Sequence, residues 1–224
     1  MSHGQAIIFD WDGTLMDSEA AIVAAMREAY RQLQFPAPSY AEVRDIIGLS
    51  LDDALASLSP HIELPARCEI IANYRLNYTT RSESPKLFPG VERVLTELYQ
   101  RGYALAVATG KSHKGLKKSL AGTNLGDIFS AMRTGDQCES KPSPAMLNEI
   151  IHELGIEAES ALMIGDTEFD LAMAHSAGVA CAAVSYGAHD VQRLKLFKPV
   201  FTLDKFEELP DKLDKHFHCG VAGQ

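Results

Sequence analysis

Short apolar runs alternate with longer amphipathic stretches over most of the chain. The first run, Ala6 to Phe9, is brief, rich in β-branched residues and stopped by a charge, which is typical of a buried strand. Further apolar runs predict strands at 103–109, 128–133, 161–165, 179–184 and, as a short edge strand, 199–201. The stretches between them predict helices at 91–101, 111–120, 143–154 and 169–177. Strands separated by single helices predict an α/β fold, with a Rossmann-like three-layer parallel-sheet core.

The stretch between the first two predicted strands has a different pattern, without period-two alternation. It predicts only helices, at 17–34, 40–47, 51–58 and 65–80, the first with Ser18 as N-cap. Ser50 and Asp53 have the spacing of a capping box. We therefore expect residues 17–84 to form a small helical insertion after the first strand. Residues 1–16 and 85–216 would form the core, and 217–224 a disordered tail.

Bulk properties exclude several classes of partner. A net charge of -9 over 224 residues argues against a nucleic-acid-binding surface, which needs clustered basic residues. The chain has no run of 18 apolar residues and no secretory leader pattern, so we expect no membrane association and a cytoplasmic location. Four scattered cysteines without a C-x-x-C pair favour reduced thiols. The small cluster of His216, His218 and Cys219 near the C-terminus is assigned no role.

Polar residues stand where several predicted strands end. Asp10 and Asp12 follow the first strand, Thr109 ends the second, and Asp166 follows the strand at 161–165. Lys141 precedes Pro142 in a loop, and Asp170 lies four residues after Asp166, so both carboxylates can face one side of a helix start. Each feature also has an ordinary structural explanation, namely a turn, a helix cap, a solvated lysine or an acidic helix N-terminus.

Taken together, these motifs resemble those of the haloacid dehalogenase superfamily, specifically its phosphatases. Its Asp-x-Asp-Gly-Thr motif stands here as Asp10-Trp-Asp-Gly-Thr14, and its later motifs stand as Thr109, Lys141 and Gly165-Asp-Thr-Glu-Phe-Asp170. All four occur in the family's order, and the resemblance covers nearly the whole chain. The helical insertion matches the cap of phosphoglycolate-phosphatase-like members. Trp11 departs from the aliphatic residue usual at its position, and we expect it to pack beside the site.

The resemblance implies a Mg²⁺-dependent phosphatase that hydrolyses small phosphomonoesters through an aspartyl-phosphate, with catalytic Asp10, Asp12, Thr109 and Lys141. Asp10 would be the nucleophile and Asp12 the general acid and base. An ionised Asp needs no base, but a cation and a lysine must offset its repulsion of the phosphate dianion. Mg²⁺ would be held by Asp10, the backbone carbonyl of Asp12 and Asp166, with Asp170 orienting Lys141 or a metal-bound water. Thr109, the Gly110 amide and Lys141 would bind the phosphate oxygens.

The family also contains other activities. Asp12 argues against a dehalogenase, which replaces this residue. Residues 17–85 contain no lysine to form the Schiff base of the phosphonate-cleaving members. A sugar phosphomutase remains an alternative, although Gly165 stands where mutases tend to carry Glu, and so does a non-catalytic phosphate-binding protein. The expected partner is a small phosphorylated metabolite, and the expected assembly is a monomer or small homo-oligomer.

Substrate choice in this family depends on the cap. Arg44 lies just before Ile46-Ile-Gly-Leu-Ser50, a turn that resembles the family's specificity loop. We hypothesise that this turn reaches the active site, that Gly48 permits close approach and that Arg44 meets an anionic leaving group. The alternative for Arg44, which the sequence favours, is a surface charge paired with a neighbouring acid. Phosphoglycolate, a sugar phosphate, a nucleotide and pyrophosphate all remain open as substrates.

Overall fold

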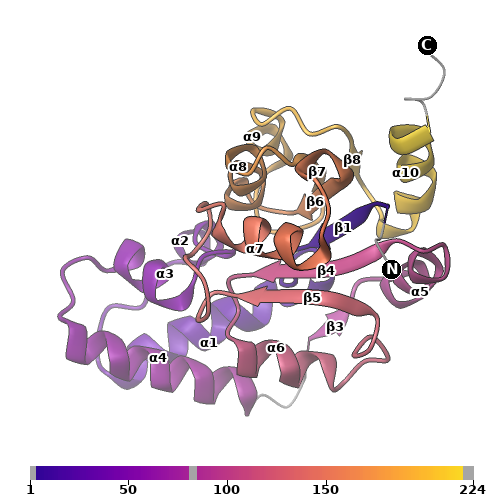
Figure 1. Ribbon diagram of the computed structural model, residues 1–224. Coiled ribbons are helices and arrows are strands. Elements are labelled where there is room, and N and C mark those ends of the chain that lie inside the picture. Colours follow the sequence, from indigo (N-terminus) through magenta and orange to yellow (C-terminus); the bar gives the residue numbers. More distant parts are fainter. Residues whose placement is uncertain (1–3, 81–84, 219–224) are drawn as a thin grey trace.

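A six-stranded parallel sheet forms the centre of the protein (Figure 1). The structure is a computed structural model, and it describes residues 4–80 and 85–218. In spatial order the strands are β5 (Phe129–Thr134), β4 (Ala104–Thr109), β1 (Ala6–Phe9), β6 (Ala161–Gly165), β7 (Ala180–Val184) and β8 (Thr202–Leu203). The first strand of the chain is therefore central, with β4 and β6 as its neighbours. This order aligns the carboxyl ends of β4, β1 and β6 at one edge of the sheet.

Side chains of the central strand alternate between two hydrophobic layers. Ile7 and Phe9 of β1 face one layer and Ile8 faces the other, because successive side chains of a strand point to opposite faces. The first layer is covered by α5 (Val91–Gln100), α6 (His113–Leu120) and α10 (Leu209–His218). The second is covered by α7 (Ala145–Leu154), α8 (Glu168–Ser176) and α9 (Val191–Lys195). The predicted three-layer α/β architecture is confirmed.

The helices that follow β1 gather beside the sheet and have a core of their own. They are α1 (Glu19–Gln32), α2 (Tyr40–Asp45), α3 (Leu51–Leu58) and α4 (Leu64–Thr79), and they form the purple part of Figure 1. Buried Met26, Tyr30, Leu55 and Ile70 belong to a hydrophobic cluster separate from the two layers of the sheet. We call these four helices the helical unit.

A two-stranded antiparallel ribbon connects the helical unit to the sheet. It pairs β2 (Met16–Asp17) with β3 (Lys86–Leu87), so the chain leaves and re-enters the core at one place. Two-residue strands are too short for a periodic pattern, so they could not be predicted from the sequence.

The chain near its C-terminus differs from the sequence-based expectation. The edge strand expected at 199–201 is β8, shifted to Thr202–Leu203. Helix α10 extends to His218, so the tail does not begin at 217, and the Phe217 ring lies 6.2 Å from that of Tyr103. Helices α9 and α10 and two short 3-10 helices, Ala158–Ser160 and Phe206–Glu208, were also not predicted. Cys219 and the rest of the expected tail lie outside the described residues. Within the described part of the chain, every helix is too short or too polar to cross a membrane.

Candidate active site

The carboxyl edge of the sheet brings together residues that lie far apart in the sequence. Asp10 follows β1, Thr109 ends β4 and Asp166 follows β6. Lys141 reaches the same place from the loop before α7, and Asp170 from the first turn of α8. All five are almost fully buried. A lysine and three carboxylates buried together are rare without a function, because each charge loses its hydration.

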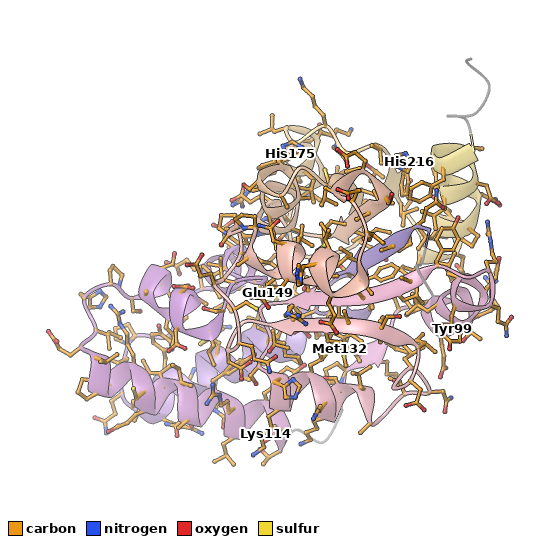
Figure 2. The ribbon with its side chains drawn as sticks, in the orientation of Figure 1. Tyr99, Lys114, Met132, Glu149, His175 and His216 are labelled. Carbon is orange, nitrogen blue, oxygen red and sulfur yellow. The ribbon has the colours of Figure 1, made fainter. Side chains whose placement is uncertain are left out.

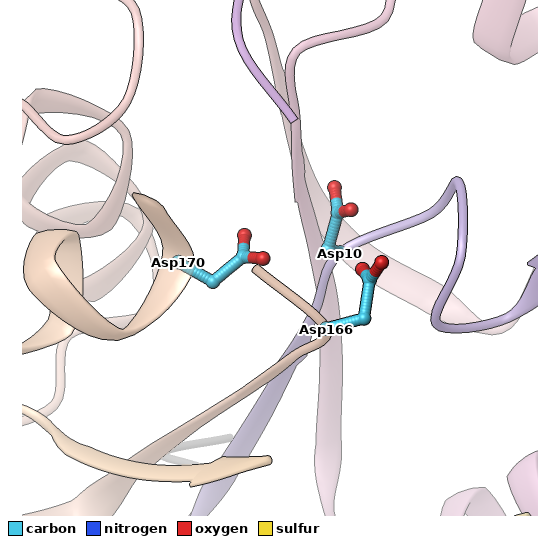
Figure 3. A group of neighbouring side chains, drawn as sticks. All are labelled: Asp10, Asp166 and Asp170. Carbon is cyan, nitrogen blue, oxygen red and sulfur yellow. The ribbon is translucent and has the colours of Figure 1, made fainter. Parts of the chain in front are cut away.

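Three of the carboxylates converge. One oxygen each of Asp10, Asp166 and Asp170 lie within 4.8 Å of one another, and Figure 3 shows Asp10 and Asp166 side by side after their strands, with Asp170 approaching from its helix. Thr14 Oγ1 donates to one Asp166 oxygen at 2.9 Å and the Ala188 amide donates to the other at 2.8 Å. These donors hold Asp166 in a defined orientation.

Lys141 bridges two of these carboxylates. Its Nζ donates to Asp10 Oδ1 at 2.7 Å and to Asp170 Oδ1 at 2.5 Å. The other Asp170 oxygen accepts from the amide and the hydroxyl of Thr167, which caps α8. Both oxygens of Asp170 therefore accept hydrogen bonds within the protein.

The electrostatics of the cluster are dominated by burial. Desolvation raises the pKa of Asp10 from 3.8 to about 7, with further repulsion from Asp170 and Asp12, although Lys141 opposes the shift. Burial and the charges of Asp10 and Asp170 also raise the pKa of Asp166 well above its ordinary value. Burial alone would lower the pKa of Lys141, but Asp10 and Asp170 outweigh it and raise it. The cluster thus carries more negative charge than Lys141 can neutralise.

This excess of negative charge fits a divalent cation. Asp10 Oδ2 is buried and has no hydrogen-bond partner, which is costly for a carboxylate oxygen unless a ligand occupies it. Carboxylate oxygens are the hard ligands that Mg²⁺ prefers. Asp10, Asp166 and Asp170 each have one oxygen that could serve as such a ligand. The oxygens of Asp166 and Asp170 also accept hydrogen bonds from the protein, whereas Asp10 Oδ2 has no donor.

The Asp12 carboxylate has a different environment from the other three. It lies outside their cluster and accepts from Lys111 Nζ at 2.9 and 2.7 Å and from Ser18 Oγ at 2.7 Å. Ser18 is the predicted N-cap of α1, but its side chain makes no capping bond and holds Asp12 instead. If Asp12 takes part in metal binding, its backbone carbonyl would therefore be the ligand, since both side-chain oxygens are held by Lys111 and Ser18.

Lys111 was not among the residues singled out from the sequence. It lies two residues after Thr109, before Ser112 caps α6, and its ammonium also lies 4.8 Å from the centre of the Tyr78 ring in α4. Burial would lower the pKa of Lys111, but Asp12 outweighs it and raises that pKa. Lys111 therefore connects Asp12 of the core with the helical unit. Its position after Thr109-Gly110 was the only signal in the sequence.

The turn between α2 and α3 lies directly against the sheet edge. A Cβ on Gly110 would come within 2.3 Å of the Leu49 carbonyl oxygen and 2.5 Å of that of Gly48. Gly48 itself has φ +103° and faces Thr167 and Phe169. The Ser50 amide donates to Ser140 Oγ at 2.8 Å, while the Ser50 hydroxyl accepts from the Asp53 amide. The turn thus reaches the site, and glycine is needed on both sides of the contact.

Arg44 does not point into the site. It pairs with Glu19 at 3.4 Å and donates to the Gly187 carbonyl at 3.3 Å. It is absent from the residues that line the cavity next to Asp10. The structure therefore favours the alternative considered for Arg44, a charge paired with a neighbouring acid.

The loop after β7 supports the site, although no motif in the sequence indicates it. Besides the Ala188 amide on Asp166, the Tyr186 hydroxyl donates to the Thr14 carbonyl at 3.1 Å. His189 Nδ1 accepts from the Glu168 amide at 3.1 Å, so Nε2 carries the proton and donates to the Asp45 carbonyl at 3.3 Å. Burial lowers the pKa of this imidazole. These contacts connect the Asp166 segment to the helical unit.

A cavity of about 760 Å³ lies between the helical unit and the sheet edge. Asp10, Asp12 and Thr109 line its inner end. The α1 and α4 side chains line one wall, and α6 lines the other. A ligand in this cavity would contact both the carboxylates and the helical unit.

Comparisons with known proteins agree with this site. Residues 7–184 match the family model of haloacid dehalogenase-like hydrolases, so the chain belongs to that family. It is 35% identical to the probable phosphatase IndB of Dickeya dadantii, over 91% of this chain and 90% of that protein. It is 32% identical to a phosphoglycolate phosphatase of Vibrio cholerae, over 91% and 94% of the two chains. The crystal structure of a predicted phosphoglycolate phosphatase from Haemophilus somnus superposes with a TM-score of 0.85, at 26% identity, over 94% and 98%.

The family model establishes the family of this chain, and the similar phosphatases indicate its branch within that family. The protein is a hydrolase of the phosphatase type, in the branch that includes the phosphoglycolate phosphatases.

Proposed function

We propose that the protein is a Mg²⁺-dependent phosphomonoesterase that works through an aspartyl-phosphate on Asp10. The observation that carries the proposal is the buried group of Asp10, Asp166, Asp170 and Lys141, with Asp10 Oδ2 unpartnered. Asp10, the carbonyl of Asp12 and Asp166 would hold the cation, which supplies charge neutralisation for the incoming phosphate. Lys141, the Thr109 hydroxyl and the Gly110 amide would bind the remaining phosphate oxygens.

The reaction proceeds in two steps on the residues of this chain. An Asp10 oxygen attacks phosphorus, the ester P–O bond breaks, and protonated Asp12 transfers its proton to the departing alkoxide. Asp12, now a carboxylate, then accepts a proton from water as the water oxygen attacks phosphorus. The bond between Asp10 and phosphorus breaks, phosphate leaves, and Asp12 is again protonated. Lys111 and Ser18 hold the Asp12 side chain during both steps.

The helical unit would act as the cap that covers the leaving group. The proposed boundaries are 17–84 for this cap and 1–16 with 85–218 for the core, whose end is moved from 216 because α10 extends to His218. The β2–β3 ribbon, where the chain leaves and re-enters the core, supports this division. The contact of Gly48 and Leu49 with Gly110 supports a closed arrangement over Thr109. The names of the phosphoglycolate phosphatase relatives support a small phosphorylated metabolite as the substrate.

Phosphate release from a panel of phosphomonoesters tests the proposal. With Mg²⁺ we expect turnover that EDTA abolishes and excess Mg²⁺ restores. Asp10→Asn should fold but lower kcat at least about thousandfold, since the nucleophile is lost. Metal-independent turnover, or wild-type kcat in Asp10→Asn, would contradict it. Transfer of phosphate between two sugar phosphates without release would instead support a mutase.

A further inference from the structure

The cavity next to Asp10 has the composition of a site for an apolar group rather than for a short acid. Aliphatic and aromatic side chains of the helical unit line it, namely Ile22, Met26, Ile47, Leu51, Ala54 and Tyr74, and four of these six are buried. The Tyr74 and Tyr78 rings lie next to each other, with centroids 5.9 Å apart. Burial raises the pKa of both phenols, so these rings stay uncharged. Such surfaces favour a ring or another bulky hydrocarbon part of a ligand.

The inner end of the cavity offers no spare cation among the residues that the structure describes. Lys141 is bound to Asp10 and Asp170, and Lys111 to Asp12 and the Tyr78 ring. Arg44 is turned towards Glu19. A carboxylate attached one carbon away from the reacting phosphate would therefore be buried against apolar side chains without a partner, which is costly.

The remaining basic residues lie further out. Lys114 and Lys118 of α6 and Arg75 of α4 line the cavity but are exposed. Figure 2 shows Lys114 on α6 at the side that faces α4. Lys118 already donates to the carbonyl of Thr79 at 3.4 Å. These charges are placed at the cavity mouth, where they attract an anionic substrate but do not contact a short leaving group.

The volume supports the same conclusion. Cavities of roughly 300–1,000 Å³ bury ligands of drug size, and this one measures about 760 Å³. Glycolate, a two-carbon acid, would leave most of the apolar wall uncovered.

We infer that the preferred substrate is a phosphomonoester whose leaving group carries an aromatic or alicyclic ring close to the ester oxygen, seated against Tyr74 and Met26, rather than a short carboxylic acid such as phosphoglycolate. The inference rests on the proposed function, because it describes the leaving-group side of the same site. It differs from the substrate named for several of the relatives.

Three primary-alkyl phosphates with leaving groups of similar basicity test this inference: benzyl phosphate, ethyl phosphate and phosphoglycolate. We expect kcat/KM for benzyl phosphate to exceed both others by at least about tenfold, the range that one apolar pocket contact provides. Equal or faster hydrolysis of ethyl phosphate or phosphoglycolate would overturn the inference while leaving the proposed function intact.

A binding experiment separates the two proposals when turnover is absent. Wild-type protein with Mg²⁺ is titrated calorimetrically with 2-phenylethylphosphonate and 3-phosphonopropionate, which are stable analogues of benzyl phosphate and phosphoglycolate. Tighter binding of the phenyl compound by at least about tenfold supports the cavity assignment, and equal or weaker binding overturns it. Failure to hydrolyse any phosphomonoester counts against the proposed function alone.

Two substitutions locate the preference in the cavity wall. Tyr74→Ala should reduce the benzyl-to-ethyl ratio of kcat/KM about fivefold or more, whereas Tyr74→Phe, the matched control, retains the ring and the ratio. Leu51→Glu places a charge in the same wall at the first turn of α3, where an acidic residue suits the helix dipole. It should lower the ratio similarly without removing packed volume. An unchanged ratio in a folded Tyr74→Ala or Leu51→Glu protein would overturn the assignment.

Discussion

At the scale of single residues, the site depends on which carboxylate each lysine contacts. Lys141 holds Asp10 and Asp170, whereas Lys111 holds Asp12. This division keeps the proposed nucleophile, Asp10, separate from the proposed proton-transfer group, Asp12, although they are two positions apart in the chain. A buried lysine that donates hydrogen bonds to a carboxylate fixes the orientation of that carboxylate and offsets its negative charge.

Substitution of Lys111 tests whether it positions Asp12. We expect Lys111→Met to lower kcat about tenfold or more for an alkyl phosphate, because Asp12 loses two of its three hydrogen bonds. The loss should be smaller for p-nitrophenyl phosphate, whose leaving group needs no proton. Steady-state kinetics on both substrates measure the difference.

Lys117→Met is the matched control, since Lys117 is exposed on α6 and does not line the cavity. It should leave both rates close to wild type. Equal losses on the two substrates in Lys111→Met would show that Lys111 supports the fold rather than the orientation of Asp12.

Several residues of the site follow from the sequence, and others do not. Asp10, Thr109 and Asp166 could be placed because parallel strands bring their carboxyl ends to one edge. Lys111 could not, because its partner Asp12 is 99 positions away and nothing local distinguishes it from a solvated lysine. For Arg44, the pairing with an acid that the sequence favours agrees with its Glu19 partner, but its contact with Gly187 could not be predicted, since it depends on how the helical unit lies on the core.

At the scale of secondary-structure elements, the turn between α2 and α3 is the contact through which the helical unit reaches the sheet. Its carbonyls lie against Gly110, and its Ser50 amide bonds to Ser140. Other links to the core are Arg193 of α9, which pairs with Glu168 and with Asp45 at the end of α2, and Lys118 of α6, which donates to the Thr79 carbonyl. The helical unit is thus tied to the core through several of its helices.

Gly110→Ala tests the importance of the first contact. The new Cβ would overlap two backbone carbonyls, which are not flexible side-chain ends, so the turn must move away from Thr109. We expect kcat/KM to fall about tenfold or more while the far-ultraviolet circular dichroism spectrum is retained.

Gly126→Ala serves as the control, because a Cβ there meets nothing within 4 Å. It should leave kcat/KM unchanged. Wild-type activity in Gly110→Ala would mean that the turn and the sheet edge need not touch for catalysis.

The long periodic elements were predictable, and the short ones were not. The strands at Ala104–Thr109 and Ala161–Gly165 each have a continuous apolar run, and α5 has a clear apolar stripe. The β2–β3 ribbon and α9 are two and five residues long, too short for a period to be recognised. Helix α10 was missed because its polar surface resembles that of a tail, although Leu209 and Leu213 are buried.

At the scale of the whole molecule, the acidic cluster makes stability depend on pH and metal. Asp10 has a pKa of about 7 in the folded protein and 3.8 ordinarily, so the folded state binds the proton more tightly. The stabilisation from this proton is complete below about pH 4 and is lost as the pH rises to about 7. On the proposed function, a divalent cation bound at the cluster would replace the proton and restore stability.

We therefore expect that, at pH 8, the thermal midpoint of the EDTA-treated protein is roughly 5–10 °C lower than the midpoint of the protein saturated with Mg²⁺. The difference should shrink towards pH 5, where protons compete with the metal. Asp10→Asn should raise the midpoint of the metal-free protein at pH 8 and weaken its response to Mg²⁺. Differential scanning calorimetry measures each midpoint, and a metal effect that is independent of pH would contradict this account of the cluster.

The central claim is that Asp10 carries the phosphoryl group, and chemical trapping tests it most directly. Asp12→Asn is mixed with Mg²⁺ and p-nitrophenyl phosphate, whose leaving group needs no proton, so the first step proceeds and the second is slowed. Borohydride then reduces any aspartyl-phosphate, and peptide mass spectrometry locates the product. The account predicts homoserine at position 10, dependent on substrate and Mg²⁺. Phosphate release with Asp10 unmodified, or homoserine at another position, would contradict it.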